Sequence, residues 1–217
     1  MGAILSDIRA AFNNVYSGWI LWNLFLAFVP LALSFWLYRL RKNFYSRSVA
    51  WWLGFVIFIA FLPNAPYLLT DIIHLIRGTR GVSSLWIIAL IFIPLHVFAI
   101  LIGFEAYVVA LINQSYYLKR QGVGQFILWS ELMTHALCAI GIYLGRFLRF
   151  NSWDLVTEPR YIIHTTLDTL TSKRPLFVIM MTFTILAVLY WCFKQLTLGV
   201  ALRMKYVRMG KDVLDEI

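Results

Sequence analysis

A stripe of polar side chains follows a proline-rich stretch of the sequence at helical spacing. The stretch FLPNAPYLLTDIIH covers residues 61–74, and it places Tyr67, Thr70, Asp71 and His74 at positions i, i+3, i+4 and i+7, which share one face of an α-helix. Asp71 and His74 could bind a metal ion, or form a general-base pair in which the carboxylate orients the imidazole. A stripe that simply faces water would explain the same pattern, so both interpretations stay open.

A second group of residues suited to chemistry lies in GRFLRFNSWD, residues 145–154. Arg146 and Arg149 are i, i+3 neighbours, and a guanidinium is a rigid donor fork that fits carboxylate or phosphate. Either arginine could pair with Asp71 or receive an anion. Asn151 with Asp154 three residues later also fits a helix start, at which the asparagine caps the helix. The predicted ligand-binding residues are Asn64, Tyr67, Thr70, Asp71, His74, Arg146, Arg149, Asn151, Trp153 and Asp154.

Four further ionisable residues, His96, Glu105, Glu131 and His135, fall inside apolar runs. Two histidines on neighbouring helices could ligate a haem, Glu131 with His135 could bind another metal, or the group could carry protons or ions. Neighbouring polar groups could also satisfy each of them without any ligand. No H-E-x-x-H, Walker A, G-x-S-x-G or C-x-x-C pattern is present in the sequence, so neither a reaction nor a cofactor follows from it.

The composition is that of an integral membrane protein. Of 217 residues, 61% are hydrophobic and only 13% are charged, whereas soluble proteins carry about 25% charged residues. The net charge of +9 is not read as a nucleic-acid signal, because basic residues at the ends of apolar spans orient them against lipid headgroups. The expected partner is therefore the lipid bilayer, with no nucleic acid.

The apolar runs are long enough for five spanning helices, each needing about 20 largely apolar residues. The predicted spans cover residues 18–38, 48–62 with a continuation, 85 to about 112, 126–148 and 176–193. Residues 161–171 predict a helix that lies at the membrane interface. We therefore expect an all-α fold, a polytopic membrane helical bundle, formed as a single integral-membrane domain over residues 1–217.

Basic residues orient this bundle. Arg39, Arg41, Lys42 and Arg47 lie between the first two spans, and more basic residues follow the fifth span. Because cytoplasmic loops are rich in lysine and arginine, we expect the C-terminus in the cytoplasm of a cell and both polar motifs at the outer end of the bundle.

The prolines interrupt the second span. Pro63 and Pro66 both lack a backbone donor and clash with the preceding helical turn, so the span should stop there. Asn64 is a suitable cap for a new short helix that begins near Ala65 and ends at Gly78. This segment is predicted to be a broken or re-entrant helix whose polar face meets protein or a water-filled cavity, since lipid cannot satisfy polar groups.

The two polar motifs together resemble a known family. LPNAPYLLTD followed by GRFLRFNSWD is similar to a bacterial family of multi-pass membrane proteins of unknown function, number thirteen sixty-one in the domain-of-unknown-function series. The resemblance runs from about the first span to the fifth. It implies that the family hallmarks are Asn64, Pro66, Tyr67, Thr70, Asp71, Arg146, Arg149, Asn151, Ser152, Trp153 and Asp154, and it implies no activity, cofactor or substrate.

Three functions remain open on the sequence. The first is binding, or an enzymatic reaction, of an anionic and possibly lipid-linked ligand near the outer leaflet; an Asp71–Arg146 salt bridge that sealed the gap would count against it. The second is a non-catalytic subunit or assembly partner of a larger membrane complex. The third is a small ion or solute transporter with a path along Glu131, His135 and Glu105.

Overall fold

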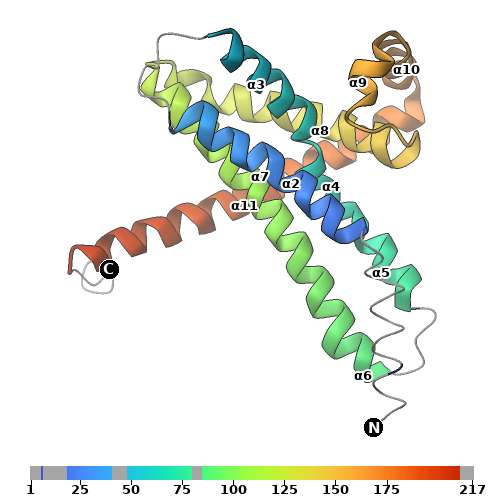
Figure 1. Cartoon of the computed structure of the whole chain (residues 1–217), viewed down its shortest axis with the longest axis horizontal. Coiled ribbons are helices and arrows are strands. Elements are labelled where there is room, and N and C mark those ends of the chain that lie inside the picture. Colours follow the sequence, from blue (N-terminus) through green and yellow to red (C-terminus); the bar gives the residue numbers. More distant parts are fainter. Residues whose placement is uncertain (1–5, 7–18, 41–47, 80–84, 211–217) are drawn as a thin grey trace.

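The computed structural model describes residues 6, 19–40, 48–79 and 85–210, and all regular structure in these ranges is helical (Figure 1). Five helical stretches are long and apolar enough to cross a membrane, which confirms the predicted class of fold. The stretches are α2 (Trp19–Tyr38), α3 (Val49–Phe61) with its continuation, α6 to α7 (Leu85–Arg120), η3 to α8 (Gly124–Phe147) and α11 (Lys173–Arg208). Arg41, Lys42 and Arg47 lie outside the described residues, so the orientation of the bundle stays a prediction.

The proline-rich stretch kinks the second span without turning the chain back. Three short helices follow α3, namely α4 (Asn64–Tyr67), the 3-10 helix η1 (Leu68–Asp71) and α5 (Ile72–Thr79), and Figure 1 shows α4 and α5 continuing in the general direction of α3. Leu62 and Pro63 both keep right-handed helical dihedrals. The segment is therefore a broken helix, and it continues through Gly78 to Thr79 instead of ending at that glycine.

The prediction that Asn64 caps a new helix is wrong. Its side-chain Nδ2 instead donates to the Phe61 carbonyl at 2.9 Å. The reason is local, because the Ala65 N–H bonds the Leu62 carbonyl at 3.2 Å and thus leaves the Phe61 carbonyl without its usual i+4 donor. The asparagine amide replaces that donor, so the Phe61 carbonyl keeps a hydrogen bond although the helical backbone pattern is interrupted here.

Two glycines let the broken segment pack against other spans. A Cβ atom on Gly141 of α8 would lie 2.8 Å from two ring carbons of Pro63, and one on Gly103 of α7 would collide with Leu68. Small residues at such crossings allow close approach of helices inside a membrane. Ala65, Leu68 and Asp71 are fully buried, and Tyr67 and Thr70 are partly buried, so the described part of the polar stripe is turned toward protein.

Two stretches are longer than the sequence predicted. α6 (Leu85–Ile87), the π-helix η2 (Ile88–Phe92) and α7 (Ile93–Arg120) run as one continuous helical stretch, and both this stretch and α11 contain 36 residues. At 1.5 Å per residue each measures about 54 Å, whereas the hydrocarbon core is about 30 Å thick. In Figure 1 both reach well beyond the region where the helices cross.

Two short helices connect α8 to α11. α8 proper spans Ile127–Phe147 after the 3-10 turn η3 (Gly124–Phe126), and α9 (Asp154–Thr157) and α10 (Pro159–Thr171) follow it. α10 confirms the helix expected over residues 161–171. Ile163 and Leu167 are exposed on it, whereas Leu170 packs against the core and Ile162 and Thr169 are buried.

Candidate functional site

An ion pair between the buried Asp71 and the partly buried Arg146 joins the two polar motifs. Nη2 of Arg146 lies 3.2 Å from Oδ1 of Asp71 and also donates to the Thr70 carbonyl. Nδ2 of Asn23, on α2, donates to the other carboxylate oxygen at 3.1 Å. The guanidinium of Arg146 also stands over the Tyr67 ring, 5.0 Å from its centroid. Three spans therefore meet at one carboxylate, which fixes the end of α8 against the broken helix.

This pairing limits what Asp71 can do chemically. Its carboxylate is fully buried and bonded to Arg146 and Asn23, so it is a positioning group and not an accessible base. The side chain of His74 lies outside the described residues, and a metal site involving it stays a prediction. Among the described residues, no three His, Cys, Asp or Glu side chains gather closely enough to hold a metal ion.

Arg149 ends α8 in a left-handed backbone conformation. It has a φ of 60°, and no other non-glycine residue among those described has a positive φ. The turn allows the Phe150 N–H to return to the Leu144 carbonyl at 3.2 Å. Glycine usually occupies this position at helix ends, because a Cβ atom is crowded there. Arg149 therefore adopts a backbone conformation that is unfavourable for a residue with a Cβ atom.

The loop after Arg149 is tied to the proline break. Oγ of Ser152 accepts from Nδ2 of Asn64 at 3.0 Å. Oδ2 of Asp154 accepts from the Asn151 N–H at 2.7 Å, and the Asp154 N–H donates to the Asn151 carbonyl at 3.0 Å. The prediction that Asn151 caps the next helix is therefore wrong: α9 begins at Asp154, and the aspartate side chain closes the turn. The Asn151 side chain itself stays outside these bonds.

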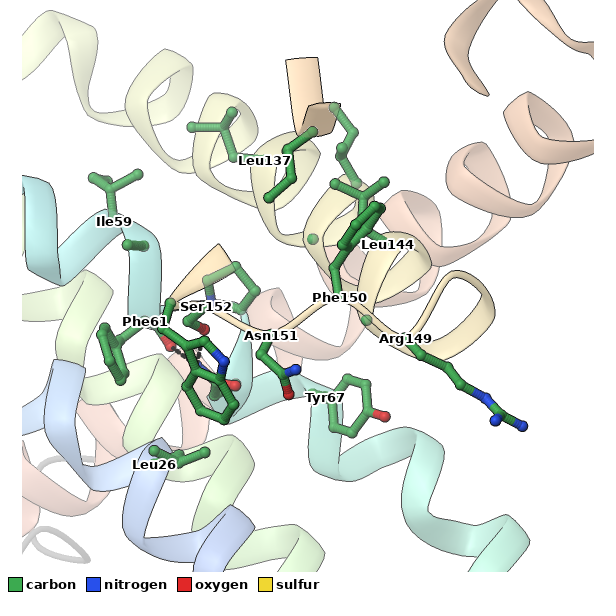
Figure 2. Close-up of a pocket in the computed structure, with 18 of the residues that line it drawn as sticks. Leu26, Ile59, Phe61, Tyr67, Leu137, Leu144, Arg149, Phe150, Asn151 and Ser152 are labelled. Carbon is green, nitrogen blue, oxygen red and sulfur yellow. Dashed lines mark hydrogen bonds between the residues drawn. The ribbon is translucent and has the colours of Figure 1, made fainter. Parts of the chain in front are cut away.

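A cavity of about 560 Å³ lies beside the ion pair, between α2, the end of α3, α8 and α10 (Figure 2). This size is ordinary for a small-molecule site, about 300–1,000 Å³. We call the apolar part of its lining the apolar wall and the polar part the polar mouth. The apolar wall includes Leu26, Ile59, Phe61, Leu137, Ile140 and Leu144, and the polar part includes Asn23, Asn64, Tyr67, Arg149, Asn151, Ser152 and Thr166.

The charge around this cavity has one sign. Among the residues that the structure describes, Arg149 is the only charged one in its lining, and none of the lining residues is a carboxylate. Within the described part of the chain, Arg149 takes part in neither of the two salt bridges, Asp71–Arg146 and Glu131–Lys194. Figure 2 shows the Asn151 side chain between Phe61 and Tyr67, while the Arg149 side chain extends away from them. Arg149 is thus a lining residue whose side chain extends away from Phe61 and Tyr67, and we call its position the rim.

The predicted residues divide into two groups. Five of them line the cavity: Asn64, Tyr67, Arg149, Asn151 and Trp153. Thr70, Asp71, Arg146 and Asp154 are not among its lining residues and instead hold the helix ends in place. Sequence reasoning missed the apolar wall, because a leucine or isoleucine inside a span has no pattern that separates a cavity from a lipid contact.

The intramembrane residues lie elsewhere, and none of the four lines this cavity. Oε1 of Glu131 accepts from Ser115 and Tyr190, each at 2.7 Å, and from Lys194 at 2.5 Å. Nδ1 of His135 lies 2.5 Å from the Tyr107 hydroxyl. Each of these two residues thus has close protein partners.

The remaining two are also bonded within the protein. Oε1 of Glu105 accepts from Thr197 at 2.7 Å, and Nδ1 of His96 lies 3.1 Å from the Phe92 carbonyl in its own helical stretch. These bonds favour the packing interpretation. The haem, the transporter path and the subunit role stay predictions.

Comparisons with known proteins give a family without an activity. No curated protein and no solved structure matches the chain significantly. A family model described as "Protein of unknown function (DUF1361)" matches residues 22–188, which include both polar motifs and all the described residues that line the cavity. The chain therefore belongs to the DUF1361 family.

Proposed function

We propose that this protein binds an anionic amphiphile of the lipid bilayer in the cavity between α3 and α8. The observation that carries the proposal is the combination of an apolar wall with a single charged residue, Arg149, among the lining residues that the structure describes. A neutral apolar ligand would leave that cation and the polar mouth without partners. A water-soluble anion would leave the apolar wall uncovered.

The polar mouth must supply the selectivity. A hydrocarbon tail that moves from the bilayer into the cavity exchanges one apolar surrounding for another, so it gains little free energy. A charge-assisted hydrogen bond between arginine and a phosphate or carboxylate is stronger and directional. The tail thus places the ligand in the cavity, and Arg149 with the neighbouring amides selects its headgroup.

The ion pair supports this role by positioning. Arg146 binds Asp71 and the Thr70 carbonyl, which holds the end of α8 and thereby the turn that carries Arg149. The pair does not seal the gap, because the cavity remains beside it. We propose binding and not catalysis, since the carboxylate that the sequence offered as a base is already bonded. We place the site in the outer leaflet as part of this proposal, because the basic residues between the first two spans favour a cytoplasmic position for the other end of the bundle.

Retention of lipid by the purified protein tests the proposal. The full chain would be purified in a mild detergent, given equal amounts of dioleoyl phosphatidylglycerol and dioleoyl phosphatidylcholine, and analysed by native mass spectrometry. We expect one retained phosphatidylglycerol per chain. Arg149→Ala should lower this retention about tenfold, the worth of one charge-assisted hydrogen bond. Arg203→Ala, an exposed position on α11, should not. Equal retention of both lipids by the wild type would refute the proposal.

A further inference from the structure

The hydrogen-bonding groups of the cavity differ from those that a bare phosphate needs. Asn23 and Asn64 both line the cavity, and both use their NH2 groups inside the protein. Nδ2 of Asn23 donates to Asp71, and Nδ2 of Asn64 donates to the Phe61 carbonyl and to Ser152. Because a carbonyl and an ionised carboxylate only accept, the orientation of both amides is fixed.

What these two amides leave for a ligand is a pair of acceptors. In the described part of the chain, Oδ1 of Asn23 and Oδ1 of Asn64 accept no hydrogen bond, and the Asn151 side chain makes none. A carbonyl oxygen that is removed from water without a donor costs free energy. A ligand that covers these oxygens must therefore bring donors of its own.

The charge at the rim restricts which donors are suitable. Phosphate oxygens at neutral pH accept hydrogen bonds but supply no donor for the two asparagine carbonyls. An ammonium group would supply donors, but the one charged residue among the described lining residues is Arg149, and it repels a second cation. Hydroxyl groups supply donors without charge. Their oxygens can in turn accept from Ser152, whose Oγ already accepts from Asn64.

We infer that the headgroup carries hydroxyl groups beside its anionic group, as in a phospholipid whose phosphate is esterified to glycerol or another polyol. This inference rests on the proposed function and narrows its ligand class. The phosphate meets Arg149 at the rim, the polyol meets the asparagine carbonyls within the mouth, and the tail follows the apolar wall. Each part of the ligand then faces a group of matching chemistry.

A set of lipids with identical dioleoyl tails tests the headgroup. Native mass spectrometry of the full chain would compare phosphatidylglycerol, phosphatidic acid, phosphatidylethanolamine and phosphatidylcholine, with soluble glycerol phosphate as a tail-free competitor. We expect phosphatidylglycerol to be retained at least about fivefold better than phosphatidic acid, the effect of one or two hydrogen bonds. Glycerol phosphate should not displace it.

Two variants test whether the Asn151 side chain recognises the headgroup. Asn151→Ala should reduce the preference for phosphatidylglycerol over phosphatidic acid to about twofold. The Asn151 backbone bonds to Asp154 remain possible in this variant. Thr184→Val is the control, because the Thr184 hydroxyl is exposed and bonds the carbonyl of Met180 in its own helix. This variant should change the retention of neither lipid.

The outcomes distinguish the two proposals. Equal retention of phosphatidylglycerol and phosphatidic acid, both above phosphatidylcholine, would overturn the polyol inference and leave anionic-lipid binding intact. Preference for phosphatidylethanolamine would also overturn it, in favour of an amine. No preference for either anionic lipid over phosphatidylcholine would overturn the proposed function itself.

Discussion

Replacing Arg149 with glycine should stabilise the fold and weaken ligand binding at the same time. The residue has a φ of 60°, and the left-handed conformation costs a residue with a Cβ atom about 1–2 kcal/mol. Glycine avoids that cost but loses about 0.5–1 kcal/mol through its greater freedom in the unfolded chain. The net expectation is a stabilisation of about 0.5–1 kcal/mol, which corresponds to a rise in Tm of about 2 °C for a chain of this size.

The same substitution removes the cation from the rim of the cavity. Retention of phosphatidylglycerol should fall about tenfold, as for alanine at this position. Thermal unfolding and native mass spectrometry on the same purified preparation measure both effects. Arg149→Lys is the matched variant, because it keeps the charge and the Cβ atom. It should retain most of the binding without gaining stability.

Either of two results would refute this reasoning. If Arg149→Gly lowered the Tm by several degrees, the arginine side chain would contribute to packing, and its conformation would not be a cost tolerated for function. If stability rose but lipid retention stayed at the wild-type level, the rim cation would have no role in binding.

Three further substitutions test the frame of the site. Asp71→Ala should destabilise the protein by about 3–5 kcal/mol, because it leaves the buried guanidinium of Arg146 without its counter-ion; denaturant unfolding checks this, and a loss below 1 kcal/mol would contradict it. Gly141→Ala should lower the free energy of unfolding by about 1–3 kcal/mol, since the new methyl group would lie 2.8 Å from the rigid ring of Pro63. A neutral effect would show that the helices separate easily. Lys194→Met should lower the unfolding midpoint, because it leaves the buried carboxylate of Glu131 without its cation. An unchanged midpoint would mean that the glutamate finds another partner.

The sequence predicted the spans and the meeting of the two motifs well, because both depend on strong local signals. Apolar length predicts a span directly, and Pro63 with Pro66 predicts a break. The end of α8 that carries the arginines could be expected near Asp71, since the number of membrane spans between them places both at the same end of the bundle. The sequence could not predict which arginine pairs with Asp71. The directions of the Arg146 and Arg149 side chains depend on the turn at the end of α8, which forms only in the folded chain.

The details of the break could not be read in the same way. Asn64 has the chemistry of a helix cap, yet the chain stays helical and the amide bonds backward to Phe61. That choice depends on tertiary packing of the segment against Gly103 and Gly141. The cavity is equally a tertiary property, since its wall consists of apolar residues, such as Ile59 and Ile140, from separate helices.

Site-resolved photo-crosslinking tests the central claim most directly. A phosphatidylglycerol with a diazirine in its tail would be reconstituted with the full chain in phosphatidylcholine nanodiscs, and the labelled residues would be mapped by mass spectrometry. We predict labelling of the cavity wall at Ile59 and Ile140, suppressed by excess unlabelled phosphatidylglycerol and by Arg149→Ala. Labelling confined to outward-facing positions such as the exposed Met133 of α8, with no competition, would contradict a lipid site between α3 and α8.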